Sequence, residues 1–252
     1  MKKELLESLI LKGVNTHESS NLPRSFSPSM LGSTLLQNFL TKVFGYQPDD
    51  SIGHNTLGSL MHYSLQHLVA SENILNEMKY KYEMKNGVTL SFIVDMMTLD
   101  KDGFITSIHD YKLTKIYAGK QLKKEKNHPY ALQLNAYYYA LKEMNLISPN
   151  FEGLFSDMFY KDADVLLKEE IYEQIQIPLI AGIEDIIISK SDELFSYIDE
   201  GEMPPECSNE DKWIRKMKSG LVVPSRCVAY CSLKTVCPYF KGESLASNLS
   251  SW

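Results

Sequence analysis

The most informative stretch of this sequence is Val88–Lys115, which reads VTLSFIVDMMTLDKDGFITSIHDYKLTK. Two runs rich in apolar and β-branched residues flank Asp102-Gly103, a dipeptide typical of a tight turn between antiparallel strands. Counting outward from a two-residue turn places Asp95 opposite Asp110. A turn with two more residues keeps both carboxylates on one face, because side chains alternate along a strand. The stretch therefore predicts a hairpin that brings two acids together.

A lysine joins the two acids on the same face of the predicted sheet. Lys112 follows Asp110 by two residues, so their side chains point the same way. Two carboxylates at this range repel each other, and burying them is costly unless a cation lies between them. A divalent metal ion held by oxygen ligands, with an ammonium group beside it, fits this set. The alternative is a solvated strand face, although Asp95 interrupts an otherwise apolar run.

Composition excludes several classes of protein. The 252 residues suffice for one large domain or two small ones, and 44% of them are hydrophobic. No apolar run is long enough to span a membrane, and Glu4 and Glu7 interrupt any signal-peptide core, so we expect a cytoplasmic protein without a membrane partner. The net charge of −6 does not by itself indicate nucleic-acid binding. Lysines are concentrated over 112–126, where they form either a phosphate-binding strip or a solvated loop.

Helical spacing brings further polar residues into the argument. Residues 55–69 predict a helix in which Gly58 and His62, four residues apart, share a face. A later helix carries Gln133 and Tyr137 at the same spacing. A lone helical histidine is more often packed or solvated than a ligand, and aromatic residues on a helix more often pack in the core. Beside the acidic hairpin, His62 nevertheless becomes a candidate third metal ligand.

The other segments complete an α/β pattern. Ser27 is a good N-cap, and Pro28 fits the first turn of a predicted helix. The elements expected after the hairpin are a lysine-rich loop over 116–128, a helix from Pro129, strands over 151–161 and 164–177, and a helix over 178–200. Strands interleaved with helices predict an α/β sheet covered by helices.

The cysteines are gathered near the C-terminus. They are Cys207, Cys227, Cys231 and Cys237, with the spacing C-x19-C-x3-C-x5-C. Because disulfides are rare in cytoplasmic proteins, four grouped thiols predict a metal or cluster site. Four thiolates can hold either a structural zinc ion or an iron–sulfur cluster. The alternative is four unconnected buried cysteines.

Taken in order, these motifs resemble the PD-(D/E)XK nuclease superfamily, in particular its RecB-like branch with a C-terminal cysteine cluster. The pieces that carry the resemblance are SFSPSML, Gly58-x3-His62, Ile93-Val94-Asp95, Asp110-Tyr111-Lys112, Gln133-x3-Tyr137, PPEC and RCVAYCSLKTVCPYF. Each motif is weak alone, but the ordered set is specific. The resemblance implies a restriction-endonuclease-like α/β core with a mixed central sheet flanked by helices, followed by a four-cysteine element. It divides the chain into an N-terminal helix and arm (1–24), a nuclease core (25–200) and the C-terminal element (201–252).

The resemblance also implies roles for the candidate residues. The ligands of Mg²⁺ or Mn²⁺ would be His62, Asp95, Asp110 and the backbone carbonyl of Tyr111. Lys112 would position or activate the attacking water and stabilise the charged phosphate. Gln133 and Tyr137 would contact the DNA backbone or support the site. Such a site suits phosphodiester hydrolysis, since a cation neutralises the phosphate and lowers the pKa of water.

For the four cysteines the resemblance implies a [4Fe–4S] cluster, with Zn²⁺ as the alternative. Two departures leave the cluster type open. Many relatives have their first cysteine near the N-terminus, a place that Cys207 would take here, and the tail has C-x3-C where a two-residue spacing is common.

The function that follows is a metal-dependent DNA exonuclease acting on DNA ends, with single strands as the preferred substrate, in phage or bacterial recombination, replication or repair. One alternative is a CRISPR-adaptation nuclease that trims prespacer DNA. Another is a non-catalytic DNA-binding or assembly subunit with structural metal sites. The expected partners are DNA, recombination or replication proteins, and a second copy of the chain.

Overall fold

The computed structural model of the chain describes residues 24–44, 58–65, 71–163, 170–216, 222–224, 226–227, 231, 233 and 237–239. These residues belong to two compact units. The first contains residues 24–32 and 58–191, and the second contains residues 33–44 and the described residues from 192 onward. Within these ranges, no helix is both long and apolar enough to cross a membrane. The expected N-terminal helix and arm lie outside the described residues except for Arg24, and the division of the chain at residue 200 stays a prediction.

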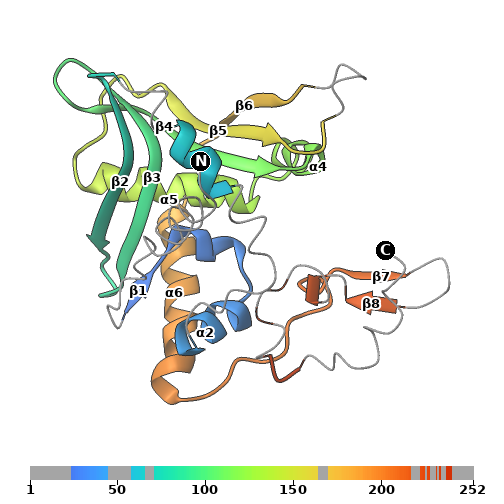
Figure 1. Cartoon of the computed structure of the whole chain (residues 1–252). Helices are drawn as coiled ribbons and strands as arrows, with labels where there is room; N and C mark the ends of the chain where they lie inside the picture. Colours follow the sequence, from blue (N-terminus) through green and yellow to red (C-terminus); the bar gives the residue numbers. More distant parts are fainter. Residues whose placement is uncertain are drawn as a thin grey trace, which may run out of the picture. The chain divides into compact units, whose positions relative to one another are not determined.

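A six-stranded mixed sheet forms the centre of the first unit (Figure 1). Its strands are β1 (Ser25–Phe26), β2 (Ile74–Glu83), β3 (Thr89–Leu99), β4 (Ile105–Thr114), β5 (Gly153–Tyr160) and β6 (Tyr172–Ile177). Their order is β1-β3-β4-β5-β6, with β2 paired to β3 beside this path. The β1–β3 and β4–β5 pairs are parallel, and the other three are antiparallel. The mixed central sheet that the resemblance implies is therefore confirmed.

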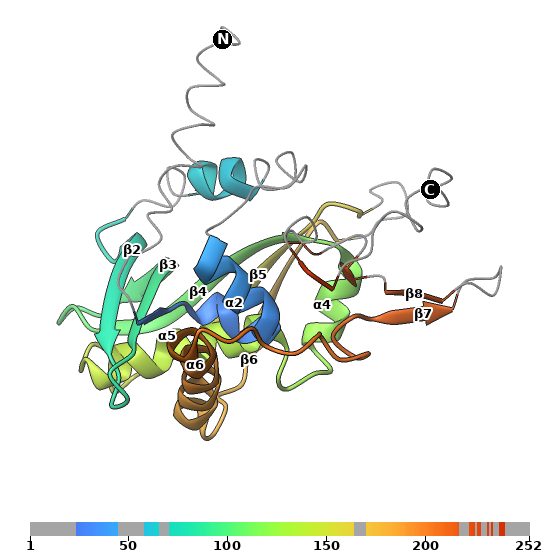
Figure 2. The ribbon, with the colours of Figure 1, turned by 90° about the horizontal axis from the view of Figure 1, so that it is seen from below.

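Helices lie on both sides of this sheet. Helix α5 (Pro129–Glu143) runs along one face, where the ring of Tyr137 stacks on Phe92 of β3. The helical residues 58–65 lie on the other side (Figure 2). The first unit also contains the 3-10 helix η1 (Pro28–Gly32), α4 (Ile116–Leu122) and the first half of α6 (Ile183–Glu200). Its deeply buried apolar side chains include Leu90, Val94, Ile108, Leu134, Leu141, Leu154 and Met158.

The helix predicted from Pro28 is broken into two pieces, and this part of the prediction is wrong. The 3-10 helix η1 ends at Gly32, where an added Cβ atom would clash with the Pro129 side chain. A new helix, α2 (Leu35–Phe44), then begins behind Thr34. Thr34 and Gln37 bond to each other's backbone N–H groups, at 3.2 and 3.3 Å, which is the capping-box arrangement. This local cap starts the second helix.

The lysine-rich segment 116–128 was expected to be a loop, and this expectation is wrong for its first half. Residues Ile116–Leu122 form α4. The first backbone N–H of α4 donates to Asp162 Oδ1 at 2.8 Å, and Gly119 lets the helix approach Tyr160 so closely that a Cβ atom would clash with its hydroxyl. Both contacts come from distant sequence, which explains why local composition did not reveal the helix.

The later elements follow the predictions more closely. The helix from Pro129 and the strand within 151–161 are confirmed as α5 and β5, and the next strand begins at Tyr172. The last long helix begins at Ile183 instead of residue 178. Asn135 of α5 explains the delay, because its side chain donates to Pro178 O at 3.1 Å and accepts from Ile180 N at 2.7 Å. These bonds hold the preceding residues in an extended loop.

The second unit contains α2, the second half of α6 and a two-stranded sheet. The two strands, β7 (Ile214–Lys216) and β8 (Val222–Pro224), pair in an antiparallel manner. Its buried apolar side chains include Leu36, Phe39, Leu40, Leu194 and Phe195. All four cysteines belong to this unit, and each is of intermediate exposure.

Candidate active site

The candidate site lies where β3 and β4 separate. Their backbone pairing runs from Leu99 and Ile105 to Met96 and His109, and the next residue on each strand is an aspartate, Asp95 or Asp110. Beyond this point the Tyr111 N–H donates to Asp95 Oδ2 at 2.7 Å. The Asp95 carboxylate thus takes the place of a strand carbonyl, and the hairpin opens around the two acids.

The expected register is reached by an unexpected route. Gly103 adopts a φ of +85° in a turn that donates its N–H to Asp100 O, so the strands first pair as Leu99 with Ile105. This pairing is one residue away from the register of a two-residue turn. A one-residue irregularity next to Leu99 shifts it back, so that Thr98 pairs with Ser107. The two deviations cancel and bring the two aspartates together.

One half of the site is a hydrogen-bonded network between β4 and α5. Lys112 Nζ lies 2.7 Å from Asp110 Oδ2, and Gln133 Nε2 donates to Asp110 Oδ1 at 3.1 Å. Gln133 also donates to the Tyr137 hydroxyl. The Lys112 ammonium lies 5.1 Å from the centre of the Tyr130 ring, in a cation–π contact. Asp110 is 1% exposed, so the ammonium and the amide supply the partners that a buried carboxylate requires.

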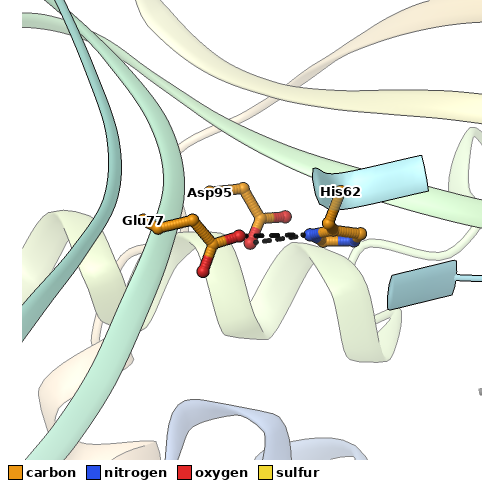
Figure 3. Close-up of side chains that lie close together, drawn as sticks. All are labelled: His62, Glu77 and Asp95. Carbon is orange, nitrogen blue, oxygen red and sulfur yellow. Dashed lines mark ion pairs between the residues drawn. The ribbon is translucent and has the colours of Figure 1, made fainter. Parts of the chain in front are cut away.

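The other half joins β2, β3 and the helical residues 58–65 (Figure 3). His62 Nδ1 lies 3.5 Å from Glu77 Oε1 and 3.6 Å from Asp95 Oδ1. One donor atom from each of the three residues lies within 4.8 Å of the others. Two carboxylates and one imidazole are ligands that divalent cations accept. The geometry therefore forms a cluster of metal-ligating atoms.

Glu77 is the site residue that sequence reasoning missed. It sits on β2, where the regular pairing with β3 joins the residues on either side and leaves out Glu77 and Asp95 themselves. Its backbone φ of +51° is uncommon for a non-glycine residue and costs on the order of 1–3 kcal/mol. The sequence NEMKYKYE gave only a weak indication of a site residue. Because β2 is partly exposed along its length, an acid in this polar edge strand is not unusual.

The electrostatics of the two halves differ. Burial, and then the negative charge of Asp110, raise the pKa of Asp95 to about 7. For His62, burial lowers the pKa, but the hydrogen bond and charge of Glu77 and the charge of Asp95 outweigh it, so the pKa is raised. For Lys112, burial also lowers the pKa, and the charges of Asp110 and Asp95 outweigh it. A proton or a cation is therefore stabilised between Asp95, Glu77 and His62.

The ligands expected from the sequence are thus only partly gathered. His62 and Asp95 contact each other, whereas the Asp110 carboxylate faces Lys112 and Gln133. Tyr111 contacts Asp95 through its N–H, and the expectation for its carbonyl stays a prediction. Among the described residues, the buried Asp110 Oδ2 receives no hydrogen bond beyond its ion pair with Lys112. Asp110 Oδ2 can therefore accept a further partner. Together with the donor atoms of His62, Glu77 and Asp95, it fits a hard divalent cation.

The four cysteines form a second candidate site, within the second unit. Burial, and then the charges of Cys207, Cys231 and Cys237, raise the pKa of Cys227, so the other three thiols lie within electrostatic range of Cys227. Gln37 Nε2 donates to Cys231 Sγ at 3.4 Å, and the Arg226 guanidinium holds the Gln37 oxygen at 2.9 Å. Polar groups that bond to sulfur in this way are typical of the surroundings of thiolate-bound metals.

Comparison with known proteins agrees with this geometry. The family model of the PD-(D/E)XK nuclease superfamily matches residues 69–238, a range that includes Glu77, Asp95, Asp110, Lys112 and all four cysteines. No curated protein matches the chain. The solved structure described as "Crystal structure of SSO0001" is similar with a TM-score of 0.60 and 15% identity, over 93% of this chain and 96% of that one, which is a likeness of fold. Because the family model covers most of the sequence, the chain belongs to the PD-(D/E)XK nuclease superfamily.

Proposed function

We propose that this protein is a divalent-metal-dependent deoxyribonuclease that shortens DNA from its ends, with single strands as the preferred substrate. The observation that carries the proposal is the opening of β3 and β4 around Asp95 and Asp110, with Lys112 Nζ 2.7 Å from the second acid. A structural role would not require a partly buried lysine beside two buried aspartates, because an apolar cluster of similar volume packs without desolvating charges. Hydrolysis of a phosphodiester does require such a set.

Each residue of the site would have a distinct role in hydrolysis. Mg²⁺ or Mn²⁺ would be held by His62, Asp95, Asp110 and the Tyr111 carbonyl. When bound, the ion neutralises the phosphate and lowers the pKa of a bound water. Lys112 lies beside Asp110 on β4, so its ammonium can hold the attacking water or a non-bridging phosphate oxygen. The ammonium stays charged at neutral pH, because the neighbouring acids raise its pKa. Lys112 therefore acts as a fixed positive charge rather than as a proton acceptor.

Gln133 and Tyr137 would position Asp110. Gln133 donates to both Asp110 Oδ1 and the Tyr137 hydroxyl, and Tyr137 is buried against Phe92. The amide thereby fixes the plane of the carboxylate from the α5 side. Because the pair is one helical turn apart, α5 presents both groups to β4 without any loop contribution.

For the second unit we propose a [4Fe–4S] cluster bound by Cys207, Cys227, Cys231 and Cys237, with Zn²⁺ as the alternative. The effect of the other three thiols on the pKa of Cys227 and the Gln37 bond to Cys231 support a shared inorganic centre. Iron, sulfide and zinc analysis of anaerobically purified protein distinguishes the two. With this centre the protein would fall in the RecB-like branch and act in bacterial or phage recombination, replication or repair, in the cytoplasm.

The test uses end-labelled single- and double-stranded DNA with Mn²⁺, Mg²⁺ or a chelator. We expect shortening of the labelled strand with either metal, none with the chelator, and none by Asp110→Asn. Circular single-stranded DNA should resist cleavage if the enzyme needs an end. DNA binding without cleavage by well-folded protein in both metals would contradict the proposal and favour a non-catalytic DNA-binding subunit.

A further inference from the structure

Glu77 contributes a carboxylate to the site from a strand that the expected ligand set does not include. Its Oε1 atom lies 3.5 Å from His62 Nδ1, and it belongs to the group of three donors within 4.8 Å of one another. Figure 3 shows its carboxylate and that of Asp95 turned toward the same ring nitrogen. A surface glutamate without a role would be free to extend into solvent, whereas this one points toward another acid.

The Asp95 carboxylate is directed into the same space. The residue is 9% exposed, and its Oδ2 atom is engaged by the Tyr111 N–H. Its Oδ1 atom faces His62 Nδ1 at 3.6 Å, beyond hydrogen-bond length. Because Oδ2 is engaged by the backbone, Oδ1 is the atom that Asp95 can offer to a cation shared with His62 and Glu77.

We propose that Glu77 is a direct ligand of the divalent ion, in addition to His62, Asp95 and Asp110. The inference rests on the proposed metal-dependent function and names a ligand that the expected set lacks. Lys112 would be left to act on the water and the phosphate. An imidazole nitrogen among the carboxylate ligands favours Mn²⁺ over Mg²⁺, which takes oxygen ligands almost exclusively.

Binding of Mn²⁺ to the full-length, anaerobically purified protein tests the proposal, with free Mn²⁺ followed by electron paramagnetic resonance. Glu77→Gln keeps the shape and removes the charge, and we expect it to raise the Kd for Mn²⁺ by roughly tenfold or more. The matched control is Glu83→Gln, which removes the same charge from an exposed position at the end of the same strand and should leave Kd unchanged. Equal Kd values for wild type and Glu77→Gln would overturn the proposal.

A second variant separates a ligand from a structural partner of His62. Glu77→Gly removes the carboxylate but suits the backbone φ of +51°. If Glu77 is a ligand, the metal-free variant keeps the wild-type melting temperature or exceeds it, while its Mn²⁺-induced stabilisation is lost. A lower melting temperature with intact Mn²⁺ stabilisation would show a purely structural role and overturn the proposal.

The outcome for Glu77 is distinguishable from the outcome for the nuclease. Glu77-dependent Mn²⁺ binding in a protein that never cleaves DNA would support the ligand and contradict the enzyme. Metal-dependent cleavage by wild type, with wild-type Mn²⁺ affinity in Glu77→Gln, would support the enzyme and contradict the ligand.

Discussion

The two halves of the site meet at Asp95 and Asp110, and they differ in how completely their charges are paired. On the α5 side, Asp110 has an ammonium at 2.7 Å and an amide at 3.1 Å. On the β2 side, Asp95 and Glu77 share a single imidazole at 3.5 to 3.6 Å. The first half places an ammonium and an amide beside one carboxylate, whereas the second half has two carboxylates and one imidazole.

This difference explains how one hairpin can hold charged groups in place and still bind a metal ion. The paired half is rigid, because breaking it would leave a buried charge without a partner. The half on the β2 side tolerates the repulsion between its carboxylates by holding a proton, as the raised pKa of Asp95 indicates. A divalent ion would replace that proton, so metal binding and proton release should be linked.

The largest expected effect comes from breaking the paired half. Lys112→Met removes the ammonium from Asp110, and we expect cleavage to fall by about 10³-fold, as for loss of one charge-stabilising group. The unpaired, buried Asp110 should also lower the free energy of unfolding by about 3 kcal/mol. Initial cleavage rates and chemical denaturation measure the two losses.

A double variant provides the control for this prediction. Asp110→Asn combined with Lys112→Met leaves no buried charge at this pair, so part of the lost stability should return while cleavage stays absent. Recovery of cleavage in the double variant, or no difference in stability between the single and double variants, would show that the pair is incidental.

The half on the β2 side predicts a pH dependence of the stability of the metal-free protein. Folding raises the pKa of Asp95 from 3.8 to about 7, through burial first and Asp110 second. The folded state therefore binds this proton more tightly, and its stabilising contribution is complete below about pH 4 and lost as the pH rises through about 7. Thermal denaturation in a chelator should show the loss, and Asp95→Asn should flatten it. Stabilisation by added Mn²⁺ should grow over the same interval.

A smaller effect is expected from the amide that orients Asp110. Gln133→Leu removes the donor to Asp110 Oδ1 but leaves the ion pair with Lys112, so cleavage should fall by roughly tenfold to a hundredfold. Gln133→Glu places a third acid beside Asp110 and should be worse than leucine. The order of the two variants in single-turnover cleavage tests whether the amide acts as a donor, and the reverse order would contradict this role.

The smallest effect is expected at Tyr137. Tyr137→Phe keeps the ring stacked on Phe92 and removes only the hydroxyl that accepts from Gln133. Because Gln133 can still donate to Asp110, cleavage should fall only a few-fold, in line with about 1 kcal/mol for one hydrogen bond. A loss as large as that of Lys112→Met would place Tyr137 in direct contact with the substrate instead.

The sequence predicted the paired half well because local rules govern it. Strand alternation placed Asp110 and Lys112 on one face of the sheet, and helical spacing placed Gln133 and Tyr137 on one face of a helix. Only the contact between Gln133 and Asp110 depends on how the helix packs on the sheet. The facing of Asp95 and Asp110 was also expected, although the turn and the irregularity beside Leu99 differ from the simple count. Patterns with fixed periods survive such compensating shifts.

Predicting the half on the β2 side required information that no single segment of the sequence contains. Glu77 lies on an exposed strand without clear alternation, and its carboxylate reaches His62 through a left-handed backbone residue. Helix α4 was missed for a related reason, since Asp162 and Tyr160 support it from far downstream in the sequence. Contacts between distant segments, and unusual backbone angles, have no local sequence signal.

The most direct test of the account measures Mn²⁺ binding and DNA cleavage side by side in wild type, Lys112→Met and Asp95→Asn. The account predicts that Lys112→Met binds Mn²⁺ as wild type does but does not cleave end-labelled DNA, whereas Asp95→Asn loses both properties. Wild-type cleavage by Lys112→Met, or undiminished Mn²⁺ binding by Asp95→Asn, would contradict the division of the site into a paired half and a metal-binding half.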